Sequence, residues 1–152
     1  YHLRKATIAD IPALTELRIA LLKAVAKLEE TPDSDITDAL ARYFAAELPH
    51  DNYVCWVALD GDTIVSTAGI CFYSFPPNFL TTTGRRAYIL NVYTLPAHRR
   101  RGLAKQLFEK LMLEATSRGI AQVSLHTSPD GRDLYTHFGF LPRDNEMVWR
   151  QG

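Results

Sequence analysis

Residues 88–115, YILNVYTLPAHRRRGLAKQLFEKLMLEA, combine a predicted buried strand, a basic turn and a long predicted helix. The strand ends in Val92, Tyr93 and Thr94, whose β-branched and aromatic side chains favour extended structure. From Leu103 onward, apolar residues recur at helical spacing, at positions 103, 107, 108, 111, 112 and 115. The stretch therefore predicts a strand that passes through a short turn into an amphipathic helix.

Three consecutive arginines and two small residues occupy that turn, as Arg99, Arg100, Arg101, Gly102 and Ala104. The first N–H groups of a helix have no partner within the helix, and the helix dipole makes that end electropositive. Small residues let the phosphates of a ligand approach the bare backbone, and the arginines add positive charge. The sequence thus predicts an anion-binding turn at the start of the helix.

Two separate motifs resemble those of one enzyme family. Arg99-x-x-Gly102-x-Ala104 after a strand resembles the Q/R-x-x-G-x-G/A motif of the GNAT superfamily of acyl-CoA-dependent N-acetyltransferases. Residues 134–140, LYTHFGF, resemble the L-Y-x-x-x-G-F segment that this family carries on its last helix. No Gly-Lys-Ser/Thr follows the turn, and the three glycines of a dinucleotide fingerprint are missing, which excludes those two phosphate-binding motifs.

The rest of the chain predicts alternating elements around one sheet, in the order β-α-α-β-β-β-α-β-α-β. The expected strands lie at about 1–7, 53–59, 63–73, 88–94, 123–127 and 146–150, and the expected helices at about 10–28, 37–48, 103–118 and 132–138. This order matches the GNAT order over nearly the whole chain. The resemblance implies one mixed α/β (α+β) domain, 1–152, with a mostly antiparallel central sheet flanked by helices.

Composition narrows the function classes. The chain has 152 residues, of which 47% are hydrophobic, and 17 basic side chains balance 17 acidic ones. A net charge of zero argues against a nucleic-acid partner. No apolar run approaches a membrane span and no signal-peptide pattern opens the sequence, so we expect a cytoplasmic protein without a membrane partner. Cys55 and Cys71 have no metal-ligand spacing, and we expect reduced thiols and no metal.

The resemblance implies roles for individual residues. The strand would hold the pantetheine arm of acetyl-CoA through Val92, Tyr93 and Thr94, and the Val92 N–H would polarise the thioester carbonyl. The coenzyme contacts would continue through Arg99, Arg100, Arg101, Gly102, Leu103, Ala104 and Lys105, and would include Ser128. Tyr135 matches the family tyrosine that protonates the leaving thiolate. A phenol stays protonated at neutral pH and can act as that general acid.

The general base is open, because Leu90 and Asn91 stand where many relatives carry a glutamate or histidine. The candidates are His126, Glu29, Glu30 and a chain of water molecules, of which we favour water. The acceptor region would lie between the first two helices, where the acidic side chains are Glu29, Glu30, Asp33, Asp35 and Asp38. The loop 75–79 is expected to add an apolar wall to the acceptor pocket.

The resemblance implies direct transfer of an acetyl group from acetyl-CoA to a primary amine of a small molecule or peptide. Two alternatives are a non-catalytic acyl-CoA-binding or sensor module and an acyltransferase that uses another acyl donor. Proteins of the family often form dimers, so a homodimer is a further expectation, through a sheet edge that the sequence does not specify.

Overall fold

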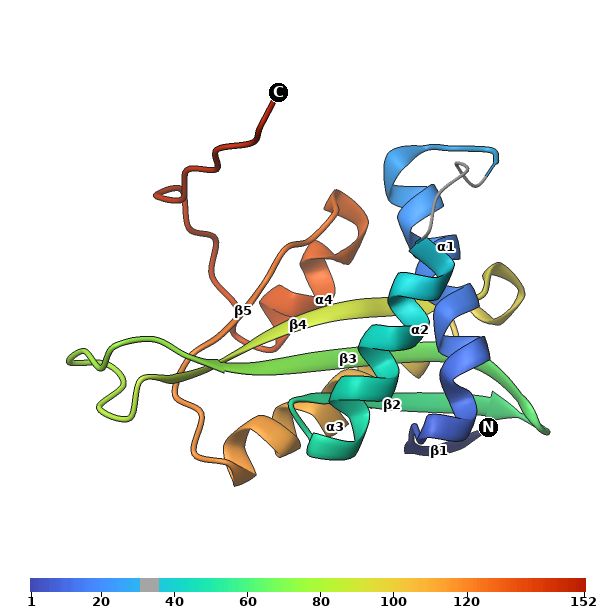
Figure 1. Ribbon diagram of the computed structural model, residues 1–152, viewed down its shortest axis with the longest axis horizontal. Helices are drawn as coiled ribbons and strands as arrows, with labels where there is room; N and C mark the ends of the chain where they lie inside the picture. The colour runs from blue at the N-terminus through green and yellow to red at the C-terminus, as the bar shows by residue number, and fades with distance from the viewer. Residues whose placement is uncertain (31–35) are drawn as a thin grey trace.

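The computed structural model describes residues 1–30 and 36–152 (Figure 1). Its strands are β1 (His2–Lys5), β2 (Tyr53–Asp60), β3 (Thr63–Ser74), β4 (Arg85–Thr94) and β5 (Val123–Leu125). Its α-helices are α1 (Ile11–Ala26), α2 (Ile36–Glu47), α3 (Leu103–Ser117) and α4 (Arg132–His137). Residues 31–34, whose sequence Thr-Pro-Asp-Ser predicts a break between the first two helices, lie outside the described residues.

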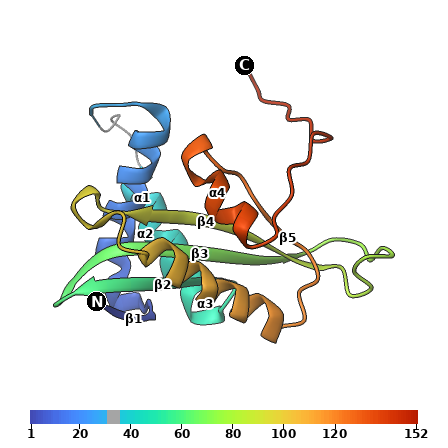
Figure 2. The same cartoon turned by 180° about the vertical axis from the view of Figure 1, so that it is seen from behind.

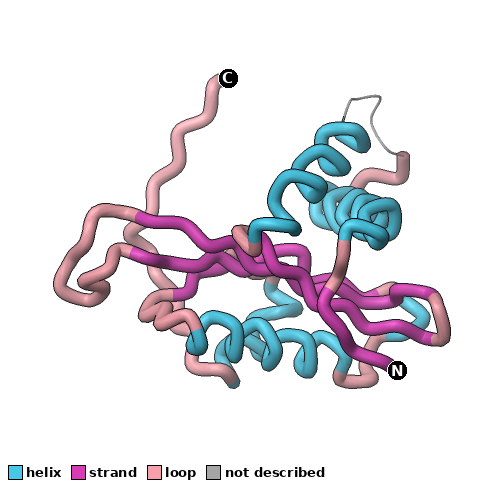
Figure 3. The backbone as a smooth tube through the Cα atoms, turned by 60° about the horizontal axis from the view of Figure 1, so that its bottom comes forward, coloured by secondary structure: helices cyan, strands magenta, loops and turns pink. Residues whose placement is uncertain are grey.

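The five strands form one sheet in the order β1-β2-β3-β4-β5. The pairs from β1 to β4 are antiparallel, and only β4 and β5 run parallel. Helices α1 and α2 lie on one face of the sheet, and α3 lies on the other (Figures 2 and 3). The predicted mixed fold with a mostly antiparallel sheet is therefore confirmed.

Alternating side chains of the central strands pack into two cores on the two faces of the sheet. One core joins β2, β3 and β4 to the buried stripe of α3, which is Leu103, Leu107, Phe108, Leu111 and Ala115. The other core joins the same strands to Leu14 and Leu17 of α1 and to Phe44 of α2. Strands β2 and β3 read as nearly continuous apolar runs because both of their faces are covered.

The parallel pair is short. It extends only from Ala87 opposite Val123 to Ile89 opposite Leu125. Beyond Ile89, β4 continues to Thr94 without a strand on that side, since no further pairing with β5 occurs within the described residues. The two strands thus separate next to the turn that leads into α3, which brings an open strand edge close to the start of a helix.

The predicted last strand, 146–150, is wrong as an element of this chain: no strand follows α4 within the described residues. Phe138 and Phe140, just after α4, still pack against Phe108, and the chain then leaves the sheet towards the C-terminus (Figure 1). The side chains of residues 146–150 have the residue types of a strand, but backbone N–H and C=O groups need a neighbouring strand to form a ladder. Without that neighbour, local preference produces no sheet structure.

Candidate active site

Asn91 interrupts β4 with a left-handed backbone conformation, φ 57°. The pairing register between β3 and β4 shifts at this level, between Thr67 and Gly69. The Thr67 hydroxyl donates to the Asn91 carbonyl oxygen at 2.8 Å. Asparagine tolerates positive φ better than most residues, so the local sequence suits this irregularity.

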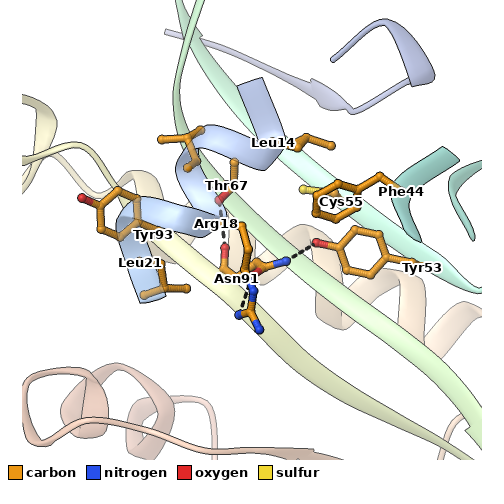
Figure 4. Close-up of a pocket in the computed structure, with 10 residues that line it drawn as sticks. Leu14, Arg18, Leu21, Phe44, Tyr53, Cys55, Thr67, Asn91 and Tyr93 are labelled. Atoms are coloured by element: carbon orange, nitrogen blue, oxygen red, sulfur yellow. Dashed lines mark hydrogen bonds between the residues drawn. The ribbon is translucent and has the colours of Figure 1, made fainter. Parts of the chain in front are cut away.

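The Asn91 side chain lies at the centre of a buried network (Figure 4). Arg18 of α1 donates to its Oδ1 at 2.8 Å, and its Nδ2 donates to the Tyr53 hydroxyl at 2.8 Å. The Tyr53 ring lies over Gly69, where a Cβ atom would stand 2.2 Å from the tyrosine oxygen. The space among these side chains is too narrow for a water molecule in this structure, so the hydrogen bonds of the network support the strand directly.

The irregularity determines which backbone groups face the open edge of β4. The carbonyl oxygens of Asn91 and Tyr93 both accept hydrogen bonds from β3, at 2.8 Å from Thr67 and 3.2 Å from Ser66. Because backbone groups alternate along a strand, Val92 directs its N–H and C=O away from β3. That is the side on which β5 has already diverged.

The turn after β4 has two residues in the left-handed region, Arg100 with φ 61° and Gly102 with φ 75°. Helix α3 begins at Leu103, whose side chain is buried and anchors the first turn against the sheet. The N–H groups of the first helical turn have no acceptor within the helix. The turn thus presents these donors to solvent beside Gly102.

The three arginines of the turn differ in their surroundings. Arg99 donates from Nε to the Thr94 carbonyl oxygen at 2.9 Å, and its guanidinium lies 5.5 Å from the centre of the Tyr93 ring. Arg100 and Arg101 are exposed. None of the three forms an ion pair with the carboxylates of the described residues. Their charges are uncompensated at the start of α3, which favours an anion there.

Tyr135 projects from α4 towards the α3 side of the sheet. Its ring centre is 5.3 Å from that of Phe108, and burial raises the pKa of its hydroxyl. That hydroxyl forms no hydrogen bond with any described residue, so it is available as a donor. Ser128 is exposed and precedes the short 3₁₀ helix Pro129–Gly131 that leads into α4.

His126 follows β5 directly and is held by two side chains that the sequence analysis did not single out. Its Nδ1 faces the hydroxyl of Tyr88 on β4, and its Nε2 lies 3.3 Å from Glu146 Oε2. Burial, followed by the nearby Glu146 charge, raises the pKa of Tyr88. Sequence reasoning missed these contacts because they depend on the parallel register of β4 and β5. That register pairs Tyr88 with Ser124 and brings His126 level with the point where the two strands separate.

The residues expected to form the acceptor pocket do not lie together in the described part of the structure. Glu29 and Glu30 are exposed beyond the end of α1, and Asp38 is exposed in the first turn of α2. Asp33 and Asp35 lie outside the described residues. The loop 75–79 projects past one end of the sheet, away from α1 (Figure 1), and Phe79 is fully exposed. In this structure the loop is not a wall of a pocket under α1 and α2.

Comparison with known proteins identifies the family. The sequence model of the "Acetyltransferase (GNAT) family" matches residues 20–140. The chain belongs to the GNAT acetyltransferase family. No match was found among curated proteins.

Solved structures agree with this assignment. A predicted acetyltransferase from Clostridium acetobutylicum, crystallised with acetyl-CoA, is 35% identical, with a TM-score of 0.90 over 98% of this chain and 95% of that one. A GCN5-related N-acetyltransferase from Ralstonia eutropha JMP134 is 26% identical, with a TM-score of 0.87 over 99% and 97%. Glucosamine-6-phosphate N-acetyltransferase from Arabidopsis thaliana shares the fold, at 21% identity and a TM-score of 0.74 over 98% and 97%.

Three further findings bear on the expectations for a membrane, a metal and the cysteines. No helix in the described part of the chain is both long and apolar enough to cross a membrane. Within residues 1–30 and 36–152, no three histidine, cysteine, aspartate or glutamate side chains gather in an arrangement suited to a metal ion. Both cysteines are free thiols, with Cys55 buried and Cys71 partly buried.

Proposed function

We propose that this GNAT protein transfers an acetyl group from acetyl-CoA directly to a primary amine of a small molecule or peptide. One observation carries the proposal: the open edge of β4 at Val92 continues through the basic turn into the unpaired N–H groups of α3. An extended thioester arm suits the strand edge, and a pyrophosphate suits the helix start. Acetyl-CoA carries both groups in one molecule.

The donor would be held along this path. Val92, Tyr93 and Thr94 would contact the pantetheine arm, and the N–H groups of the turn and of the first helical turn would bind the pyrophosphate. Arg100 and Arg101 are free to add charge, whereas Arg99 is already bound to the Thr94 carbonyl and stiffens the turn. Ser128, which precedes the 3₁₀ helix Pro129–Gly131, would contact the coenzyme from the side of β5 and α4.

The chemistry follows from three groups. The Val92 N–H would polarise the thioester carbonyl, and such a donor contributes roughly 3–4 kcal/mol to an acyl transfer. The amine nitrogen forms the new C–N bond as the C–S bond breaks. Tyr135 gives its proton to the departing thiolate, and the burial that raises its pKa keeps the phenol protonated until that step.

The acceptor ammonium must first lose a proton. In place of the water chain favoured from sequence, we propose His126 as the base, which acts through the Tyr88 hydroxyl. Glu146 favours the tautomer with hydrogen on Nε2, which leaves Nδ1 to accept from Tyr88. The proton passes to the Tyr88 oxygen, directly or through one water, while the Tyr88 hydroxyl gives its own proton to Nδ1. Leu125 pairs with Ile89, so His126 lies level with the next residue of β4, which is two residues before Val92. At the usual rise per residue this is about 7 Å along the strand.

The test combines binding and turnover. Thiol release from acetyl-CoA would be followed with a panel of primary amines, and coenzyme affinity would be measured by calorimetry. Tyr135→Phe should lower kcat by roughly 10²–10⁴-fold with little change in coenzyme Kd. Tyr73→Phe is the matched control, because Tyr73 lies on β3 opposite Arg86, away from Val92 and the basic turn. An unaltered kcat in Tyr135→Phe would remove the assigned role.

A non-catalytic acyl-CoA-binding module is the second candidate, and one observation favours it: β4 carries Leu90 and Asn91 where a carboxylate base is common in the family. It predicts coenzyme binding without transfer to any amine. Transfer from propionyl-CoA or succinyl-CoA in preference to acetyl-CoA would instead indicate a different acyl donor.

A further inference from the structure

Arg18 of α1 reaches β4 and carries a charge that no acidic side chain compensates. One of its terminal nitrogens donates to Asn91 Oδ1 at 2.8 Å, which is its single hydrogen bond to residues 1–30 and 36–152. No carboxylate of the same residues forms an ion pair with it. A guanidinium has several N–H donors, so most of them remain available to another group.

The free donors of Arg18 are open to solvent. The side chain is partly exposed, and none of its nitrogen atoms is among the buried polar atoms that lack a partner in the described part of the chain. Figure 4 shows its guanidinium end directed away from Leu14 and Phe44, which belong to the core on this face of the sheet. Arg18 therefore holds Asn91 with one N–H and offers the others at the surface.

The position of this charge relates it to the proposed acetyl transfer. Asn91, to which Arg18 is bound, directly precedes Val92, whose N–H would polarise the thioester. Tyr88 lies three residues before Asn91, about 10 Å along the strand. Burial and the charge of Glu146 raise the pKa of Tyr88, whereas the charge of Arg18 acts in the opposite direction. The guanidinium thus lies within electrostatic reach of the hydroxyl that takes part in the proposed proton transfer.

The carboxylates of this region are directed elsewhere. Glu146 lies 3.3 Å from His126 Nε2. Burial raises the pKa of the Cys71 thiol, and the charges of Glu47 and Arg18 then shift it in opposite directions, but neither glutamate pairs with Arg18. The acidic residues expected to attract a cationic amine are exposed at or beyond helix ends, or lie outside the described residues. An acceptor that approaches β4 from this face therefore meets a cation rather than a group of carboxylates.

We propose that Arg18 binds an oxyanion of the acceptor, so that the substrate is a primary amine that also carries a carboxylate or phosphate group. The inference rests on the proposed function, which places the amine at the thioester beside Val92. An oxyanion a few bonds from that amine would then reach the guanidinium beside Asn91. Guanidinium groups bind carboxylate and phosphate through two parallel hydrogen bonds, and a charged hydrogen bond is about twice as strong as a neutral one. A polyamine would instead bring positive charge towards Arg18.

The experiment compares amines that differ in one group. One pair is leucine with leucinamide, in which an uncharged amide replaces the carboxylate. The other is O-phosphoethanolamine with ethanolamine, in which a hydroxyl replaces the phosphate, and putrescine represents the cationic amines. Thiol release from acetyl-CoA gives kcat/KM for each amine, and calorimetry gives the Kd of acetyl-CoA. An amide makes the neighbouring amine easier to deprotonate than a carboxylate does, so proton loss alone would favour leucinamide over leucine.

Variants of the full chain separate the charge of Arg18 from its support of Asn91. Arg18→Gln removes the charge but keeps an N–H donor for Asn91, and Arg18→Lys keeps the charge. Arg42→Gln, which changes an exposed arginine of α2, is the matched control.

For at least one pair, we expect the unchanged protein to prefer the anionic amine. Arg18→Gln should lower kcat/KM for that amine roughly 10–100-fold, as the loss of one charged hydrogen bond implies. The uncharged partner and the Kd of acetyl-CoA should change little. Arg18→Lys should restore part of the preference, and Arg42→Gln should keep all of it. A preference within the leucine pair identifies a carboxylate, and one within the phosphoethanolamine pair identifies a phosphate.

Two outcomes overturn the inference and leave the proposed function standing. In the first, the unchanged protein acetylates leucinamide, ethanolamine or putrescine at least as well as both anionic amines. In the second, Arg18→Gln lowers kcat/KM equally for both members of the preferred pair, because the residue would then only support Asn91. Binding of acetyl-CoA without transfer to any amine overturns the proposed function itself, and the inference with it.

Discussion

Replacing Asn91 with glycine should separate the backbone role of this residue from the role of its side chain. Glycine adopts φ 57° without strain, but it removes the amide that links Arg18 to Tyr53. Tyr53 is only 1% exposed, and its hydroxyl would lose the donor that Asn91 supplies. An unsatisfied buried group of this kind costs about 1–3 kcal/mol. Arg18 is less buried and can turn to solvent.

The relief of left-handed strain offsets part of that loss, so we expect Asn91→Gly to lower the free energy of unfolding by roughly 1–2 kcal/mol. Guanidinium unfolding at constant m value would measure it. Lys27→Gly is the matched control, because Lys27 is exposed with φ 55° and makes no side-chain network. This control should stabilise the protein.

Two outcomes would refute the reasoning. If Asn91→Gly has the same effect with Tyr53 as in a Tyr53→Phe background, the two side chains are not coupled. If coenzyme affinity is unchanged despite lower stability, the Asn91 side chain does not help to align Val92 for binding. We expect a loss of up to about tenfold in acetyl-CoA affinity, which corresponds to one misaligned hydrogen bond, because the amide that anchors this part of β4 to Arg18 and Tyr53 is gone.

Three further predictions concern stability and reactivity. Arg4 donates to Asp10 at 2.7 and 3.0 Å and holds the pKa of that carboxyl below its usual range. This ion pair therefore stabilises the folded protein above pH ~4, and its contribution is lost as the pH falls through the lowered pKa of Asp10. Arg4→Gln should therefore reduce stability at pH 7 and flatten its decline in acid, followed by circular dichroism. Phe108→Ala, in a fully buried position, should cost about 3–5 kcal/mol in chemical unfolding, against little for the exposed Leu113→Ala. Burial raises the pKa of Cys55 to about 12, so iodoacetamide at pH 8 should label it only after unfolding, as read by mass spectrometry.

Much of the donor side of the candidate site could be predicted from sequence because its determinants are local. The apolar spacing from Leu103 onward defines the helix, and Gly102 supplies the left-handed residue that precedes it. The order of strand, turn and helix brings them together without help from distant residues. The role assigned to Tyr135 came from a motif resemblance and stays a prediction.

The remaining features depend on which segments meet in space. From sequence, Leu90 and Asn91 indicated only that β4 lacks a general base. In the folded chain the Asn91 side chain bonds to Arg18 of α1 and to Tyr53 of β2. The contact of His126 with Tyr88, 38 positions away, depends on the parallel register of β4 and β5, and its contact with Glu146, 20 positions away, depends on the path of the chain after α4. No local pattern encodes such a register.

By itself, the sequence of this protein determined the strand, the basic turn and the helix around residues 88–115, since periodicity and turn chemistry act over a few neighbouring residues. Only the tertiary structure decided that β4 and β5 separate beyond Ile89 and that the residues 146–150 lie unpaired. Strand formation needs a partner as well as a preference, because backbone N–H and C=O groups in a sheet are satisfied by another strand.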